Sequence, residues 1–205
     1  MILFINACVR KESRTKRLAD CLLSRLEGPV TELRLFEMDF PVVDGQFIER
    51  RERLTAEKDF HDPIFAAAHQ FAEADQIVIA APFWDMSFPA SLKQYFEQIN
   101  VVGITFQYTP EGIPEGLCKA RDLYYVTTVG GDYFPEEYGY GYVKALAQSF
   151  YQIPHVELIK ATGLDIIGAD QEQILQASMK EIAGMNGRKQ VTAAWERSAN
   201  ATLPG

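Results

Sequence analysis

Apolar residues along the chain form short uninterrupted runs, separated by longer segments in which they recur at helical spacing. The runs at 2–7 (ILFINA) and 76–82 (QIVIAAP) are continuous rather than alternating, which is typical of strands buried on both faces of a sheet. The β-branched and aromatic runs at 30–36 and 122–129 predict two more strands, and 163–169 predicts a last one. We therefore expect five strands.

Helical periodicity fills the segments between these runs. Pro89 opens one such segment at a position typical of a first helical turn. The expected helices cover 14–26, 65–74, 89–99, 143–152 and 171–184. Alternating strands and helices predict an α/β fold: a doubly wound five-stranded parallel sheet with helices on both faces. We expect one domain over 1–205, with 185–205 as a C-terminal arm or tail.

Composition limits the partners of this 205-residue chain. A net charge of −8 argues against nucleic acid, because binding to phosphate backbones requires an excess of Lys and Arg. No apolar run approaches the roughly 20 residues of a membrane span. The three cysteines lack metal-type spacing and cannot pair completely, so we expect no metal site and a cytoplasmic location.

Parallel sheets of this kind bind ligands at the carboxyl ends of their strands. At the first strand end, Ser13 and Thr15 stand where a helix begins, and Arg10, Lys11 and Arg14 add positive charge. A helix N-terminus offers free N–H donors and a partial positive charge, both of which favour a phosphate. The simpler alternative is that Ser13 only caps the helix. The glycine-rich signatures of P-loop and dinucleotide-binding proteins are missing.

Two further strand ends complete the picture. The segment PFWDMSFP (82–89) gathers bulky apolar side chains where loops are normally polar. The segment TTVGGDYF (127–134) contains paired glycines, which allow a backbone to approach a ligand closely. A phosphate cradle, an aromatic wall and a bare backbone together suit a ligand with one phosphate and one flat ring system, such as FMN.

These residues resemble the flavodoxin-like FMN-dependent NAD(P)H oxidoreductases, the NADH-azoreductases and NAD(P)H:quinone oxidoreductases. The segment INACVRKESRTKRLAD is similar to the phosphate loop of that family. The long block APFWDMSFPASLKQYFEQINVVGITFQYTPEGIPEGL is similar to the flavin loop, helix and following segment of its azoreductase branch. VTTVGGDY and LIKATGLDIIG match two further family segments, so the resemblance spans most of residues 1–185.

The resemblance implies a set of site residues. The expected FMN-binding residues are Cys8, Arg10, Ser13, Thr15, Pro82, Phe83, Trp84, Asp85, Met86, Thr128, Val129, Gly130, Gly131 and Tyr133. Tyr108 and Phe88 are the expected substrate-pocket residues, and no side chain is expected to act as a catalytic acid, base or nucleophile.

The chain departs from the family pattern at three of these positions. Cys8 stands where a serine is common, which weakens one phosphate contact or replaces it by backbone. Asp85 replaces a common asparagine and adds a negative charge beside the ring, which disfavours an anionic reduced flavin. Val129 replaces a frequent arginine and removes a possible contact to flavin or substrate.

The resemblance also implies a reaction. NAD(P)H would pass a hydride to flavin N5 and leave, after which a quinone, azo or related aromatic acceptor would occupy the same place in ping-pong turnover. A homodimer with the flavin at its interface is expected. Two alternatives stay open: a flavodoxin-type electron carrier, and a flavin-free regulatory or binding domain on the same fold.

Overall fold

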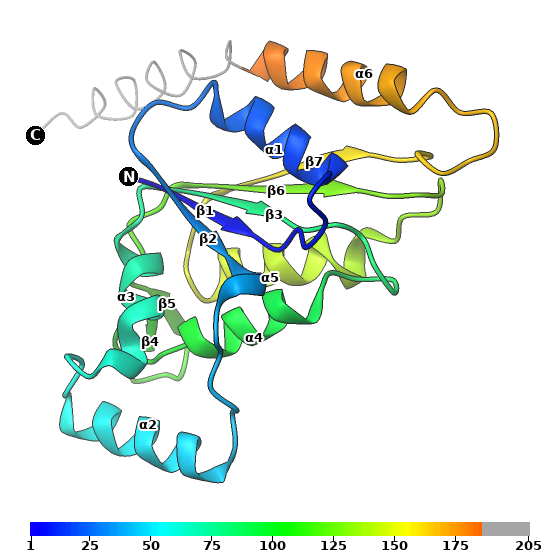
Figure 1. The fold of residues 1–205 in the computed structure, drawn as a ribbon. Helices are drawn as coiled ribbons and strands as arrows, with labels where there is room; N and C mark the ends of the chain where they lie inside the picture. The colour runs from blue at the N-terminus through cyan, green and yellow to red at the C-terminus, as the bar shows by residue number, and fades with distance from the viewer. Residues whose placement is uncertain (186–205) are drawn as a thin grey trace, which may run out of the picture.

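A five-stranded, all-parallel sheet forms the centre of the structure, a computed structural model that describes residues 1–185 (Figure 1). Its spatial order is β2-β1-β3-β6-β7. The strands are β1 (Ile2–Asn6), β2 (Val30–Arg34), β3 (Gln76–Ala80), β6 (Asp122–Thr128) and β7 (His155–Ala161). The predicted doubly wound architecture is confirmed.

Helices cover both faces of this sheet, as predicted (Figure 1). On one face α1 (Arg14–Leu23) packs beside α6 (Gln171–Gly184). The other face is covered by α3 (Ala66–Glu73), α4 (Ala90–Ile99) and α5 (Tyr140–Ser149). Each side has its own buried apolar cluster, because the central strands bury side chains on both faces.

The predicted last strand is wrong in position. The strand is β7, at 155–161, and the residues predicted as a strand at 163–169 form the turn that follows it. Gly163 and Gly168 have φ values of +78° and +85°, a left-handed conformation that a strand does not contain. Ile166 and Ile167, the isoleucines of the run predicted as that strand, are exposed.

Two elements have no counterpart among the predictions. Helix α2 (Gly45–Glu57) extends from the lower end of the molecule and has a single buried residue, Leu54 (Figure 1). A small antiparallel hairpin joins β4 (Phe106–Tyr108) to β5 (Pro114–Gly116). Short 3-10 turns, η1 (Leu35–Glu37), η2 (Pro63–Phe65) and η3 (Glu136–Tyr138), complete the described chain. The predicted C-terminal arm lies, apart from Met185, outside the described residues.

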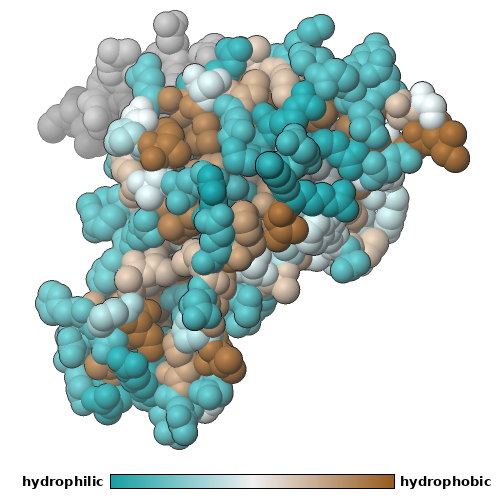
Figure 2. All heavy atoms as spheres, viewed as in Figure 1, coloured by the Kyte–Doolittle hydropathy of each residue, from teal (hydrophilic) through white to brown (hydrophobic). Residues whose placement is uncertain are grey.

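Apolar side chains reach the surface in several places, and Figure 2 shows apolar patches on the face that it draws. Among the exposed apolar residues are Val42 and Val43 on the loop that leads into α2, and Ile166 and Ile167 on the loop before α6. Between residues 1 and 185, no helix has both the length and the apolar character that a membrane crossing requires.

Candidate functional site

A cleft of about 190 Å³ opens at the carboxyl edge of the sheet. The loops after β1, β3 and β6 meet there, and the turn after β7 adds one side chain. Its walls are formed by Cys8, Val9, Arg10, Glu12, Ser13, Arg14, Thr15, Pro82, Phe83, Trp84, Thr128, Gly130 and Asp165. Nine of the sequence-predicted residues are therefore brought together in one place, as the topology of the sheet requires.

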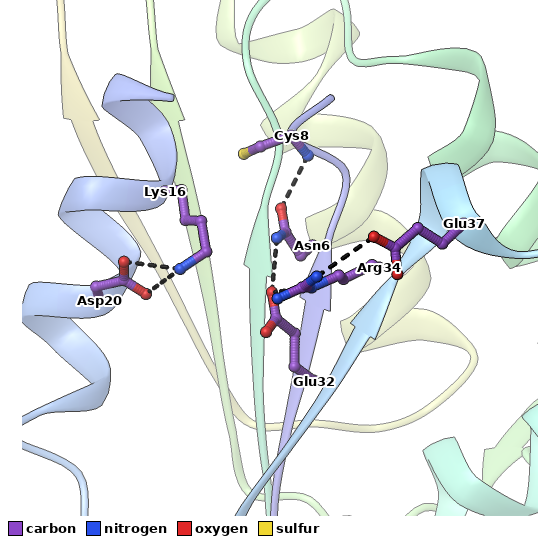
Figure 3. A network of polar contacts seen from close by, with 7 residues as sticks. All are labelled: Asn6, Cys8, Lys16, Asp20, Glu32, Arg34 and Glu37. Atoms are coloured by element: carbon purple, nitrogen blue, oxygen red, sulfur yellow. Dashed lines mark hydrogen bonds and ion pairs between the residues drawn. The ribbon is translucent and has the colours of Figure 1, made fainter. Parts of the chain in front are cut away.

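Asn6, the last residue of β1, positions the loop that follows this strand. Its buried side-chain amide makes one hydrogen bond through its oxygen and one through its nitrogen (Figure 3). Its Oδ1 accepts a hydrogen bond from the Cys8 backbone N–H at 2.9 Å, and its Nδ2 donates to Glu32 at 2.8 Å. Arg34 lies between Glu32 and Glu37 and pairs with both carboxylates. Asn6 thereby connects the loop to the paired charges of β2.

The N-terminus of α1 faces the cleft with unused donors. Ser13 is the N-cap: its Oγ accepts from the Lys16 N–H at 3.2 Å, and its side chain also hydrogen-bonds with the Cys8 thiol. The first-turn amides of Arg14 and Thr15 have no preceding carbonyl to bond within the helix. Capping and anion binding, the two interpretations of Ser13, are thus compatible in this geometry.

Arg14 contributes more to the site than the sequence indicated. Its guanidinium donates to both carboxylate oxygens of Asp165, at 2.7 and 3.3 Å, and approaches the Leu164 carbonyl at 3.4 Å. The hydrogen bond from Arg14 is the largest influence on the pKa of Asp165 and lowers it, so the carboxylate is charged at neutral pH. No sequence signal identified Asp165, because its partner lies 151 positions away.

The position of the Asp165 carboxylate leaves no room for a side chain at Gly130. A Cβ at this position would come within 2.4 Å of Asp165 Oδ2, which is closer than real contacts allow. The backbone N–H of Asp165 also donates to the Gly130 carbonyl at 2.8 Å. Beside this pair, Thr15 and Thr128 join α1 to β6 through their hydroxyls, 2.6 Å apart. Glycine at 130 therefore makes room for a protein group.

The aromatic segment after β3 folds into a tight turn. Trp84 and Ser87 exchange backbone hydrogen bonds of 3.1 and 2.8 Å around Asp85 and Met86, whose φ values are +48° and +68°. Positive φ at both central positions defines the two-residue hairpin turn normally occupied by Asn-Gly or Asp-Gly. Asp tolerates this conformation, whereas for Met86 it costs about 1–2 kcal/mol. Met86 is also exposed, so burial of its side chain does not offset this conformational cost.

Five of the predicted cofactor residues lie next to the cleft without lining it. Asp85 and Met86 occupy the exposed tip of the turn, and Gly131 and Tyr133 lie on the exposed loop after β6. Val129 is buried, and its backbone N–H continues the sheet by donating to the Ala161 carbonyl at 2.9 Å.

The two predicted substrate-pocket residues lie elsewhere. Phe88 packs into the core against the rings of Phe96 and Tyr142. Tyr108 is exposed on β4, in the hairpin that packs at the far end of α5, where the Phe106 ring stacks on Phe150. Because α5 runs back from the carboxyl edge, this hairpin lies at the opposite end of the sheet from the cleft (Figure 1). A single chain does not bring Tyr108 to the site.

Cys8 faces the sheet. Its thiol is directed at the Ala80 carbonyl, 3.6 Å away, and burial raises its pKa to about 11. A hydrogen bond with the Ser13 side chain and, to a smaller extent, the positive charge of Lys16 oppose this rise in pKa without outweighing it. Within residues 1–185 no group of His, Cys, Asp and Glu side chains is arranged to hold a metal ion.

Comparison with known proteins adds to this geometry. Residues 1–185 match the family described as having the flavodoxin-like fold. The FMN-dependent NADH:quinone oxidoreductase of Lachnoclostridium phytofermentans is 35% identical over 193 residues, covering 90% of this chain and 96% of that protein. The protein of the same name from Coprothermobacter proteolyticus is 34% identical over 192 residues, with coverage of 88% and 94%.

A solved structure points in the same direction. The azoreductase from Bacillus anthracis str. Sterne superposes with a TM-score of 0.77 at 26% sequence identity. The superposition covers 90% of this chain and 97% of that one. Both the fold and most of its length are therefore shared.

We predict that Cys8 reacts slowly with thiol reagents in the folded protein. A pKa raised from 9.0 to about 11 lowers the thiolate fraction near neutral pH by about a hundredfold. The measurement is disulfide exchange with an aromatic disulfide at pH 8, on a Cys21→Ser/Cys118→Ser variant, native and in urea. Equal rates in the two conditions would contradict the buried placement.

Proposed function

The chain belongs to the family with the flavodoxin-like fold, and on that premise we propose that it is an FMN-dependent NADH:quinone oxidoreductase of the azoreductase type. The curated relatives named above carry this activity in their names and match nearly the whole chain. Quinones and azo compounds are the proposed acceptors, and NAD(P)H is the proposed donor.

One observation carries this proposal: a phosphate cradle and an aromatic turn lie on the same cleft. The α1 N-terminus, Ser13, Arg10 and Arg14 would hold the phosphate of FMN. Phe83 and Trp84, on the opposite loop, would contact its ring system. The free first-turn amides at the helix N-terminus suit a phosphate monoester without any glycine-rich loop.

Bound FMN would supply hydride acceptance and donation at its N5 atom, which is the chemistry the protein itself lacks. The protein would bind and orient the ring against the turn at 84–87, leaving one face for NAD(P)H and then for the acceptor. One shared place for both substrates gives ping-pong turnover. Asp85, exposed at the tip of that turn, would place a negative charge near the ring edge.

A homodimer is also part of the proposal. Ile166, Ile167 and Tyr133 are exposed apolar or aromatic groups at the edge where the cleft opens, and Val42 is exposed on a separate loop. A second copy would bury such groups and could complete the ring site. The three free cysteines support a cytoplasmic location, where thiols stay reduced.

The central prediction concerns flavin binding and turnover. Protein purified with added FMN should retain a yellow chromophore and oxidise NADH or NADPH in the presence of a quinone. Trp84→Ala should lower flavin affinity about tenfold, since stacking of an aromatic ring contributes about 1–1.5 kcal/mol. His69→Ala, an exposed position on α3, is the control.

The possible outcomes separate the candidate functions. Absence of binding at micromolar FMN would exclude both the enzyme and the electron carrier and favour a flavin-free domain. Bound flavin that NAD(P)H cannot reduce would favour the carrier. Identical kinetics in the Trp84→Ala and His69→Ala variants would contradict the role given to the turn.

A second prediction isolates the phosphate. Arg14→Ala should weaken FMN binding about tenfold, because a charge-assisted hydrogen bond is lost, and should change riboflavin binding less than about twofold. Arg17→Ala is a matched control, since one guanidinium nitrogen of Arg17 donates to both carboxylate oxygens of Glu172, at 3.0 and 2.9 Å, outside the cleft. Parallel losses for FMN and riboflavin would show that Arg14 acts on the fold instead.

A third prediction concerns assembly. Light scattering coupled to size-exclusion chromatography should give about twice the chain mass of 23.1 kDa. Replacing Ile166 and Ile167 together by Ser should shift the protein toward the single-chain mass. A wild-type mass of one chain at micromolar concentration would exclude the homodimer.

A further inference from the structure

The turn at 84–87 is strained, and it contacts a separate segment at both of its ends. Asp85 and Met86 both have left-handed backbone conformations, and neither is glycine. Such a turn persists only where its surroundings oppose relaxation. The surroundings here are residues 134–139, part of the loop between β6 and α5.

The first contact is aromatic. The Phe83 ring meets the edge of Phe134, with 5.0 Å between centroids and an interplanar angle of 78°. Phe134 is itself covered by the Lys160 ammonium, 5.2 Å from its ring centroid. Lys160 also pairs with Glu136 at 2.6 Å, so the segment is attached to β7. The ring of Phe83 therefore packs against Phe134, whose segment is attached to β7.

The second contact is a single hydrogen bond. The Ser87 hydroxyl donates to the Tyr138 carbonyl at 2.6 Å, a length typical of a well-formed O–H···O bond. Gly139 follows, and an added Cβ there would lie 3.5 Å from Tyr125 Oη and 3.9 Å from the Ser87 carbonyl carbon. Residues 138 and 139 thus pack directly against the end of the turn.

We propose that Ser87 is a positioning residue for the flavin wall: its hydroxyl, bonded to the Tyr138 carbonyl, holds the strained turn that presents Trp84 to the cleft. The proposal rests on the proposed function for the identity of the ligand. The part of the proposal that concerns the turn, namely that Ser87 maintains its conformation, applies to the flavin-free protein as well. Ser87 itself does not line the cleft, so its effect on a ligand passes through Trp84.

The test uses the full chain in a Trp195→Phe background, which leaves Trp84 as its single tryptophan. Ser87→Ala should reduce the near-UV circular dichroism of Trp84 in flavin-free protein by at least about half. It should also raise the Kd for FMN about three- to tenfold, the range that one net hydrogen bond supports. Ser87→Thr, which retains the hydroxyl, should preserve both values.

Two further variants separate the strain mechanism from a general loss of stability. Ser24→Ala removes another serine hydroxyl bonded to a carbonyl, that of Cys21 at 2.7 Å, far from the cleft, and should change neither readout. Met86→Gly removes the cost of the left-handed conformation. In that background, Ser87→Ala should raise the Kd by less than about twofold.

Two results would overturn the proposal. One is that the Ser87→Ala variant shows the same near-UV signal of Trp84 and the same Kd for FMN as the Ser24→Ala control. The other is an equal Ser87→Ala effect with and without Met86→Gly, since the hydroxyl would then not oppose backbone strain. If the parent protein binds no FMN, the proposed function fails, while the Trp84 signal of the flavin-free variants still decides the role of Ser87.

Discussion

Backbone hydrogen bonds that continue the parallel ladder beyond the strand ends hold the whole site in place. Ala7 donates to Ala80 at 2.9 Å, Phe83 to Thr128 at 3.1 Å, and Val129 to Ala161 at 2.9 Å. Each bond connects the first residues of one loop to the neighbouring strand or its end. The loops after β1, β3 and β6 therefore leave the sheet in fixed register, and side chains from distant parts of the sequence converge.

The cleft has two arginines in its walls, and one of them, Arg14, is restrained by an ion pair. The chain carries a net charge of −8, yet Arg10 and Arg14 both line the cleft. Asp165 holds Arg14 by a forked contact and reduces its freedom, and the glycine at 130 makes room for that carboxylate. A partly buried guanidinium fixed in this way loses less side-chain entropy when an anion binds than a free one would.

Sequence patterns predicted the sheet and the cleft because both depend on local signals. Continuous apolar runs identify buried strands, and the strand ends then locate the site. The prediction misplaced the last strand because the apolar run at 163–169 resembles a strand, although its Ile166 and Ile167 are exposed in a glycine-flanked turn. Asp165 and the docking of Ser87 on Tyr138 were missed for another reason: both depend on contacts between segments that no periodicity connects.

The three positions at which the sequence departs from the family pattern differ in how directly their side chains can affect a bound ligand. Cys8 has its thiol turned to the Ala80 carbonyl, and Val129 is buried in the continued ladder, so neither side chain is directed at a ligand from its position. Asp85 is different, because it is exposed at the tip of the strained turn. Asp and Asn tolerate the left-handed conformation comparably well, so exchanging one for the other preserves the backbone and changes the charge. Selection at this position can therefore alter the electrostatics beside a bound ring without disturbing the turn that Ser87 supports.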